Sequence, residues 1–268
     1  MGRDFMRLLE AKWKEEKHVC VGLDKCSATH MCAIVDATCS RVAAYKPNLA
    51  FYLAYLEAGI TVLGQIISHI HRVAPDMPII LDCKDADVKS TNDEYVRMIE
   101  KLCPDAITTN PYLGQEALLP FLERNDMGVI VLCRTSNPGA KEFQDLQVSP
   151  SLWTPQLQRT FGNRMGMPLY QYVAHQVTTE WNGAGNCGVV VGATYPGELV
   201  EVRRIVGDDM PILIPGVGAQ GGDLEASVRA AKCCFLINLS RSVMNASDPR
   251  AEVLRCHEQI VQVLSSGG

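Results

Sequence analysis

The feature of this sequence that most constrains its fold is a repeated alternation of short apolar runs with longer stretches of helical pattern. The apolar runs are rich in Val, Ile and Leu and are mostly continuous, with few polar residues between them. Continuous runs of this kind are typical of strands in a parallel sheet that is covered by helices. We predict strands at residues 18–24, 42–49, 78–84, 106–111, 128–136, 188–194, 211–216 and 234–240.

Eight strand–helix units in 268 residues predict an α/β fold, a single (β/α)8 or TIM barrel that occupies residues 1–268 as one domain. A doubly wound sheet is the competing architecture. We find no linker or low-complexity segment. The longest irregular stretch runs from Ser136 to about Pro168, and we expect it to be a functional closure or a surface insertion. In a TIM barrel, the active site lies at the C-terminal ends of the strands.

Charge and composition argue against several classes of protein. The net charge of −5 argues against a nucleic-acid-binding protein, which would carry a basic face. No apolar run approaches the roughly 20 residues needed to span a membrane, and the charged N-terminal segment lacks a signal-peptide core. The 11 cysteines form no CxxC pair and the 6 histidines have no metal-ligand spacing. We therefore expect free thiols in a reducing intracellular compartment, the cytoplasm above all, and no metal site.

The most informative motif is the charged sequence LDCKDAD at residues 81–87. Asp82 and Lys84 are two residues apart at the end of a predicted strand, which places both side chains on one face. Asp87 follows in the turn that leads to the next helix. Charged groups at an apolar strand end are costly to desolvate unless they are paired, and this end of a barrel is where active sites occur. The alternative is a structural network of salt bridges or a solvated loop.

Two further predicted strands end in charged residues. Asp24 closes VCVGLD, and Lys46 lies in AAYKPN. We therefore expect carboxylates and ammonium groups from three strands to converge, although Asp24 alone would more simply cap the following helix. Such an array suits a decarboxylation, because a fixed ammonium group stabilises the carbanion that forms and supplies its proton. Alternating signs would keep each lysine protonated and each carboxyl group ionised.

The segment PILIPGVGAQGGD at residues 211–223 predicts a phosphate site. Three of its four glycines weakly match a dinucleotide-binding pattern, but they follow the seventh strand and not the first; they are Gly216, Gly218 and Gly221. Glycines here let backbone N–H groups approach an anion at a helix N-terminus, and the loops after strands seven and eight hold phosphate in many barrels. Arg241 would add a bidentate cation and Gln220 an amide donor. The alternatives are that the glycines form only a tight turn and that Arg241 is a surface residue at the start of a helix.

Two further loops carry polar residues. In CRTSNPGA, residues 133–140, Ser136 either contacts the edge of a base or caps the turn that follows. The segment TTNPYLG at residues 108–114 is similar, and we assign Asn110 no role.

Together and in order, these segments resemble orotidine 5'-monophosphate decarboxylase, from VGLD to NLSRS. The family's hallmark Asp-x-Lys-x-x-Asp is present at residues 82–87, and YKPNLAFY, CRTSNPGAKEFQDL, VVVGATYP and PGVGAQGGDLE are similar to the subgroup with a longer fifth loop. The resemblance implies conversion of orotidine 5'-monophosphate to UMP in de novo pyrimidine biosynthesis, without metal or cofactor. It also implies a homodimer with shared active sites and, in some organisms, a fused orotate phosphoribosyltransferase.

The resemblance implies a role for each candidate residue. Lys84 would protonate C6, and Asp82 would face the substrate carboxylate. Asp24 and Lys46 would hold ribose hydroxyls and complete the charged array. The other implied contacts are to the pyrimidine from Ser136, Pro215 and Val217, to the 5'-phosphate from Gln220 and Arg241, and into the neighbouring subunit's site from Asp87 and Thr91.

The chain departs from the family pattern at a few positions. Many relatives have Arg-Gly where this chain has Asp85-Ala86, and the added carboxylate is expected to change the surroundings of Lys84. Val88 stands where Ile is common. Ser240 stands where Gly is common before the phosphate arginine, which affects how closely the backbone can approach the anion. None of these changes removes a reacting group.

Three other functions remain open from the sequence. A sister decarboxylase or aldolase that acts on sugar phosphates with magnesium shares the Asp-x-Lys-x-x-Asp hallmark. A non-catalytic nucleotide-binding barrel is the second. A Schiff-base aldolase is the third, although flanking carboxylates would keep Lys84 protonated.

Overall fold

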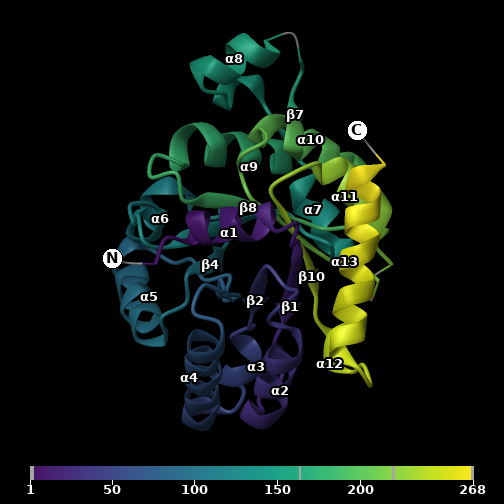
Figure 1. Ribbon diagram of the computed structural model, residues 1–268. Coiled ribbons are helices and arrows are strands. Elements are labelled where there is room, and N and C mark those ends of the chain that lie inside the picture. Colours follow the sequence, from purple (N-terminus) through teal and green to yellow (C-terminus); the bar gives the residue numbers. More distant parts are fainter. Residues whose placement is uncertain (1–2, 163, 219–220, 267–268) are drawn as a thin grey trace.

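In the computed structural model, which describes residues 3–162, 164–218 and 221–266, parallel strands surrounded by helices form the centre of the molecule (Figure 1). Within these residues the main sheet has eight strands in the order β2-β1-β10-β9-β8-β5-β4-β3. Their bounds are β1 Val19–Gly22, β2 Ala44–Lys46, β3 Ile80–Leu81, β4 Ala106–Thr109, β5 Gly128–Arg134, β8 Cys187–Val191, β9 Ile212–Pro215 and β10 Phe235–Leu239.

The two ends of this strand order also pair. Parallel bridges between Tyr45 and Ile79 and between Asn48 and Asp82 join β2 to β3. The sheet therefore closes into a barrel, which confirms the predicted TIM fold and excludes the open, doubly wound sheet.

Helices follow the strands and cover their outer faces. The apolar stripe of α4 illustrates why, because Leu63, Ile66, Ile67 and Ile70 recur at helical spacing and are all buried. Apart from the N-terminal helix, the helices outside the loop after β5 are α2 Ala28–Thr38, α3 Ala50–Leu53, α4 Leu56–Val73, α5 Lys89–Leu102, α6 Gly114–Leu122, α9 Leu169–Gln176 with the π-helix η3 Val177–Trp181, α10 Pro196–Val206, α11 Leu224–Ala231, α12 Arg241–Met244 and α13 Pro249–Ser265. Among the described helices, none is long and apolar enough to cross a membrane.

Helix α1 (Phe5–Lys14) closes the floor of the barrel, across which it lies in Figure 1. Phe5 and Leu9 belong to the apolar cluster of the barrel interior, together with Cys20 and Ile130. The indole Nε1 of Trp13 donates a hydrogen bond to the carbonyl of Phe235 at 3.0 Å. Because the N-terminal ends of the strands are covered in this way, the C-terminal ends form the accessible end of the barrel.

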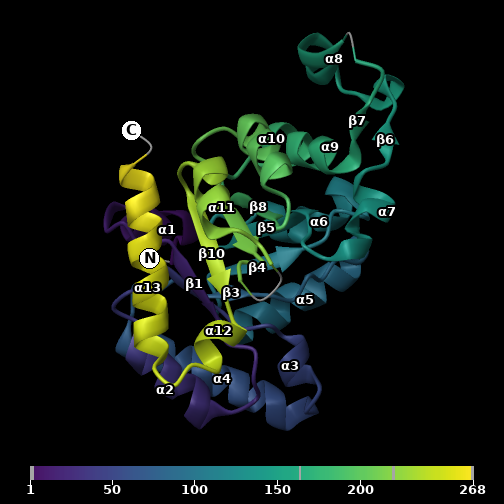
Figure 2. The ribbon, with the colours of Figure 1, turned by 90° about the vertical axis from the view of Figure 1, so that its right-hand side faces the viewer.

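The predicted irregular stretch from Ser136 to Pro168 contains short elements and a core of its own. These elements are η1 Pro138–Ala140, α7 Lys141–Gln144, β6 Gln147–Val148, η2 Pro150–Leu152, α8 Pro155–Phe161 and β7 Met167–Pro168. β6 and β7 pair as an antiparallel ribbon, and α8 stands away from the barrel (Figure 2). The apolar side chains of this stretch pack against one another in a cluster separate from the barrel core, formed by Trp153, Leu157, Phe161 and Met167. The segment is thus an insertion with internal packing.

Two predicted strands are shorter than expected. The segments at 42–49 and 78–84 pair as regular strands only over Ala44–Lys46 and Ile80–Leu81. Pro47 has no N–H to give to a ladder, and Lys84 has a left-handed backbone with a φ of 56°, which ends the extended conformation. All 11 cysteines are free.

Candidate active site

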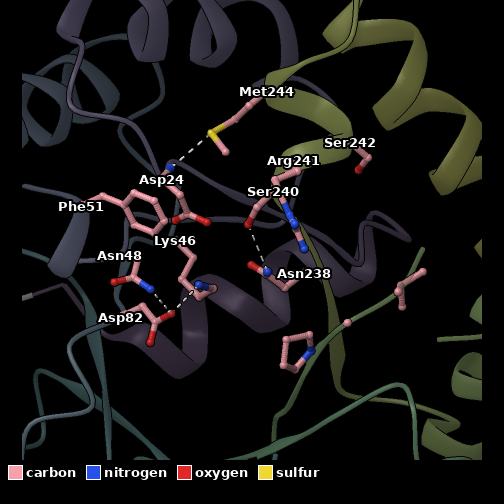
Figure 3. A pocket seen from close by; sticks show the side chains of 13 residues that line it. Asp24, Lys46, Asn48, Phe51, Asp82, Asn238, Ser240, Arg241, Ser242 and Met244 are labelled. Carbon is pink, nitrogen blue, oxygen red and sulfur yellow. Dashed lines mark hydrogen bonds and ion pairs between the residues drawn. The ribbon is translucent and has the colours of Figure 1, made fainter. Parts of the chain in front are cut away.

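A cavity of about 410 Å³ lies at the C-terminal ends of the strands, a size typical of small-ligand pockets (Figure 3). Its wall combines residues from five strand ends with the first residues of α12. The lining residues are Asp24, Lys46, Asn48, Phe51, Asp82, Pro215, Gly216, Val217, Asn238, Ser240, Arg241, Ser242 and Met244.

The carboxylate of Asp82 is the centre of the charged array. Its Oδ2 accepts from Lys46 Nζ at 2.7 Å and from Asn48 Nδ2 at 3.4 Å. Its Oδ1 accepts from Lys84 Nζ at 2.5 Å and from the Thr108 hydroxyl at 2.8 Å. Four donors therefore occupy the four lone-pair positions of one carboxylate, which fixes its orientation.

The charges of Asp82 and Lys46 stabilise each other in a buried setting. The two residues are 7% and 5% exposed. Burial alone would raise the pKa of Asp82, but the ammonium groups of Lys46 and Lys84 outweigh it and hold that pKa well below its usual range. Burial alone would lower the pKa of Lys46, but Asp82 and Asp24 outweigh it and raise that pKa. Both groups are therefore ionised at neutral pH.

Lys84 is the accessible ammonium group of the array. Its side chain is 45% exposed, whereas the side chain of Lys46 is almost completely buried. Lys84 and Asp82 meet, as predicted, but not through the pleat of a strand, because the backbone of Lys84 is left-handed. This backbone conformation is unfavourable for a residue with a Cβ atom and is most common at functional positions.

Asp24 lines the cavity and has one carboxylate oxygen without a partner among the described residues. Its Oδ1 is buried and has no hydrogen-bond partner within the part of the chain that the structure describes. Its backbone N–H donates to Met244 Sδ at 3.3 Å (Figure 3). Asp24 is not the cap of the next helix, because Ser27 caps α2 by accepting from His30 N–H. A buried acceptor without a donor is a position where a ligand hydroxyl would bind.

The predicted phosphate end also belongs to the wall of this cavity. Pro215, Gly216 and Val217 line the cavity after β9, and Arg241 does so at the start of α12. Gly216 has a φ of 98°, a conformation that favours glycine at this turn. Gln220, the other predicted phosphate ligand, lies outside the described residues.

Four predicted site residues in the described part of the chain do not line this cavity. Lys84 is one of them, and it joins the site through its ion pair with Asp82. Asp87 is exposed just before α5, where its Oδ1 accepts from the Val88 N–H at 2.6 Å, and Thr91 lies in the first turn of that helix. Ser136 packs against Gly192, where an added Cβ would lie 2.7 Å from the Ser136 Cα. Within this single chain, therefore, the structure brings together Asp24, Lys46, Asp82, Lys84, Pro215, Val217 and Arg241.

Several cavity or array residues were not identified from the sequence. Asn48 lies two residues after Lys46, and its sequence KPN was noted without a role for the amide. Asn238 is a polar residue inside the apolar run FLINL, a signal that could have identified it, because a polar side chain in a buried strand requires a partner. Thr108 gave no signal, because threonine is common in strands.

Asp85, the acidic residue that replaces the commoner arginine, lies beside the array. Its Oδ2 is buried and has no partner among the described residues. Burial raises its pKa, which the neighbouring Cys83 and Lys84 only partly oppose. The added charge is therefore held at a cost in free energy.

Comparison with known proteins agrees with this geometry. A family model described as orotidine 5'-phosphate decarboxylase / HUMPS family matches residues 17–256. The chain belongs to this family. Orotidine 5'-phosphate decarboxylase of Azoarcus sp. (strain BH72) is 41% identical to it over 262 residues, which cover 90% of each protein.

Solved structures of the orotidine 5'-phosphate decarboxylase family superimpose on nearly the whole chain. OMP decarboxylase of Leishmania donovani is similar with a TM-score of 0.85 and 33% identity, over 98% of this chain and 99% of that one. UMP synthase of the same organism is similar with a TM-score of 0.87 and 34% identity, and the match covers 98% of this chain but 57% of that one.

Proposed function

We propose that this protein is a carboxy-lyase that converts orotidine 5'-monophosphate to UMP in pyrimidine biosynthesis. The observation that carries the proposal is the array of Lys46, Asp82 and Lys84, which presents one exposed ammonium group at the accessible end of a barrel of this family. Curated relatives with this activity are about 40% identical over most of the chain.

In the proposed reaction, the bond between C6 and the carboxylate carbon breaks, CO₂ leaves, and the electron pair remains on C6. The Lys84 ammonium stabilises this carbanion and transfers a proton to it, and solvent then restores the proton on Lys84. The negative charge of Asp82 faces the substrate carboxylate and disfavours the bound substrate relative to the transition state. The low pKa of Asp82 supports this role, because the group is ionised at the working pH.

The remaining residues would bind the nucleotide. The free Oδ1 of Asp24 and the Lys46 ammonium suit ribose hydroxyls, and Arg241 with Gln220 suits the 5'-phosphate. Pro215 and Val217 offer apolar surface to the pyrimidine. Contact between Ser136 and the base would require the loop after β5 to move toward the cavity.

A second copy of the chain would complete the site. The exposed position of Asp87 and the half-buried position of Thr91, both outside the cavity of their own chain, support the proposal that they reach into the neighbouring subunit's site. Large apolar side chains are exposed in the same region of the molecule and would be covered in a homodimer; they are Tyr55, Leu56, Val88 and Tyr112. We propose that residues 1–268 act as one domain in this dimer.

The test is to incubate the purified protein with orotidine 5'-monophosphate and EDTA, and to follow the loss of the substrate's ultraviolet absorbance. We expect conversion by the wild-type chain, none by Lys84→Ala, and normal conversion by the control Lys101→Ala, which removes an exposed lysine from the end of α5.

Other outcomes would favour the alternatives. Binding of UMP without turnover, in a protein shown to be dimeric, would favour a non-catalytic nucleotide-binding barrel. Activity on sugar phosphates that EDTA abolishes would favour the magnesium-dependent sister function. Among the described residues, no group of three or more His, Cys, Asp or Glu side chains is placed to hold a metal ion.

A further inference from the structure

The end of β4 carries three successive polar side chains, Thr108, Thr109 and Asn110, and none of them is in the wall of the catalytic cavity. All three form hydrogen bonds with the segment 82–85, which contains Lys84. Thr108 and Thr109 are buried and their bonds are partly shielded from water, whereas the bond of Asn110 is exposed. This side-chain cluster therefore acts on the segment that bears the proposed proton donor.

The cluster replaces the backbone ladder between β3 and β4. Regular pairing joins Ile80 to Ala106 and Leu81 to Ile107 and then stops. Beyond this point, side chains of β4 and the residue after it bind the N–H and carbonyl of Lys84 and the carbonyl of Asp85. The N–H of Lys84 donates to Thr108 Oγ1 at 3.0 Å, Asn110 Nδ2 donates to the carbonyl of Lys84 at 3.0 Å, and Thr109 Oγ1 donates to the carbonyl of Asp85 at 2.5 Å.

Because side chains and not strand backbone bind Lys84, its backbone can adopt a left-handed conformation. In a regular strand, Lys84 would have a negative φ, and its N–H and carbonyl would point toward β2, as those of Asp82 do. Here Thr108 holds the N–H and Asn110 holds the carbonyl, while φ is 56°. An unfavourable φ of this kind persists only where neighbouring groups hold it.

Thr108 couples the backbone of Lys84 to the carboxylate of Asp82. Its hydroxyl accepts from the Lys84 N–H and donates its single hydrogen to Asp82 Oδ1 at 2.8 Å, the same oxygen that binds Lys84 Nζ. Asn110 is oriented in turn, because its Oδ1 accepts from the Tyr112 N–H at 3.2 Å and leaves Nδ2 directed at Lys84. Thr108 of β4 thus binds the backbone of Lys84 directly and its ammonium group through Asp82.

We propose that Thr108 and Asn110 are positioning residues for Lys84, which hold its left-handed backbone so that the ammonium group meets the reacting carbon. The inference rests on the proposed function, because it needs Lys84 to be the proton donor. Neither residue lines the cavity. Their loss should therefore lower kcat, while leaving nucleotide binding and folding nearly intact.

The test compares four variants for kcat and KM with orotidine 5'-monophosphate, for UMP affinity, and for the midpoint of thermal unfolding. Thr108→Val keeps the shape but removes the hydroxyl, and Thr108→Ser restores it. Asn110→Ala removes the donor to Lys84. The matched control is Gln115→Ala, because the Gln115 amide also donates to a backbone carbonyl, that of Glu180, at 2.8 Å but away from Lys84.

We expect Thr108→Val to lower kcat at least tenfold and Asn110→Ala about fivefold, with UMP affinity within twofold of wild type. Thr108→Ser should recover most of the rate, and Gln115→Ala should match wild type. Unchanged kcat in both Thr108→Val and Asn110→Ala, with an active wild type, would overturn this inference alone. So would a loss of kcat matched by equal losses of UMP affinity and thermal stability, which would indicate a general structural role. An inactive wild type would overturn the proposed function and this inference together.

Discussion

Replacing Lys46 by methionine removes the buried cation from the charged array but keeps the length of the side chain. Asp82, which is 7% exposed, would lose a 2.7 Å ion pair, and its remaining cation, Lys84, has a side chain that is 45% exposed. Breaking one side of a buried ion pair costs about 3–5 kcal/mol. Because Lys84 still compensates part of the charge, we expect Lys46→Met to lower the free energy of unfolding by about 3 kcal/mol at pH 7.

The partner variant Asp82→Asn and the double variant test whether this cost comes from the pair. In Lys46→Met/Asp82→Asn, no carboxylate remains at position 82, and the amide oxygen can still accept from Thr108. The double variant should therefore be more stable than the sum of the two single changes predicts, with a coupling free energy of about 2 kcal/mol. Urea unfolding of the four proteins, followed by circular dichroism at pH 7, gives this value. A coupling below about 0.5 kcal/mol would refute the argument, because independent sites add within that margin.

Three further predictions concern other features of the chain. Asp85→Asn should raise the free energy of unfolding by about 1 kcal/mol at pH 7, because burial raises the folded-state pKa and one buried oxygen lacks a partner among the described residues. The gain should disappear below about pH 4, where the wild-type carboxyl is protonated in both states, and urea titrations across pH would show a constant gain if this reasoning is wrong. Gly22→Ala should cost about 2 kcal/mol, because the new Cβ would lie 1.9 Å from Ser240 Oγ, and adding Ser240→Gly should recover most of the thermal stability; no recovery would contradict the packing argument. Arg203→Lys should cost about 3 kcal/mol in urea unfolding, because the guanidinium group donates to five backbone carbonyls and an ammonium group has only three N–H donors; a cost below about 1 kcal/mol would contradict it.

The barrel and the charged array could be predicted because both depend on local sequence. Buried parallel strands produce continuous apolar runs, and the charges at their ends are exceptions within those runs. The positions of Asp24, Lys46 and Asp82 follow from this pattern alone, and the structure places all three in one cavity.

The features that could not be predicted depend on contacts between distant parts of the chain. The strand at 78–84 ends early because side chains some 24–26 residues later take over its hydrogen bonds. Likewise, Ser27, and not Asp24, caps α2, a choice between two capable residues that local sequence does not decide. Asp87 and Thr91 lie outside the cavity, and their predicted role concerns a second chain.

The separate apolar cluster around α8 affects how this molecule will appear in any optical experiment. Of the three tryptophans in the chain, Trp153 belongs to that cluster, whereas Trp13 packs beneath the barrel and Trp181 ends the π-helix beside it. A unit with its own small core can open locally while the barrel remains folded. Fluorescence would then combine two signals, one from local opening and one from global unfolding. Replacing Trp153 by phenylalanine would leave only Trp13 and Trp181, which report on the barrel. Replacing those two would leave only Trp153, which reports on the projecting segment.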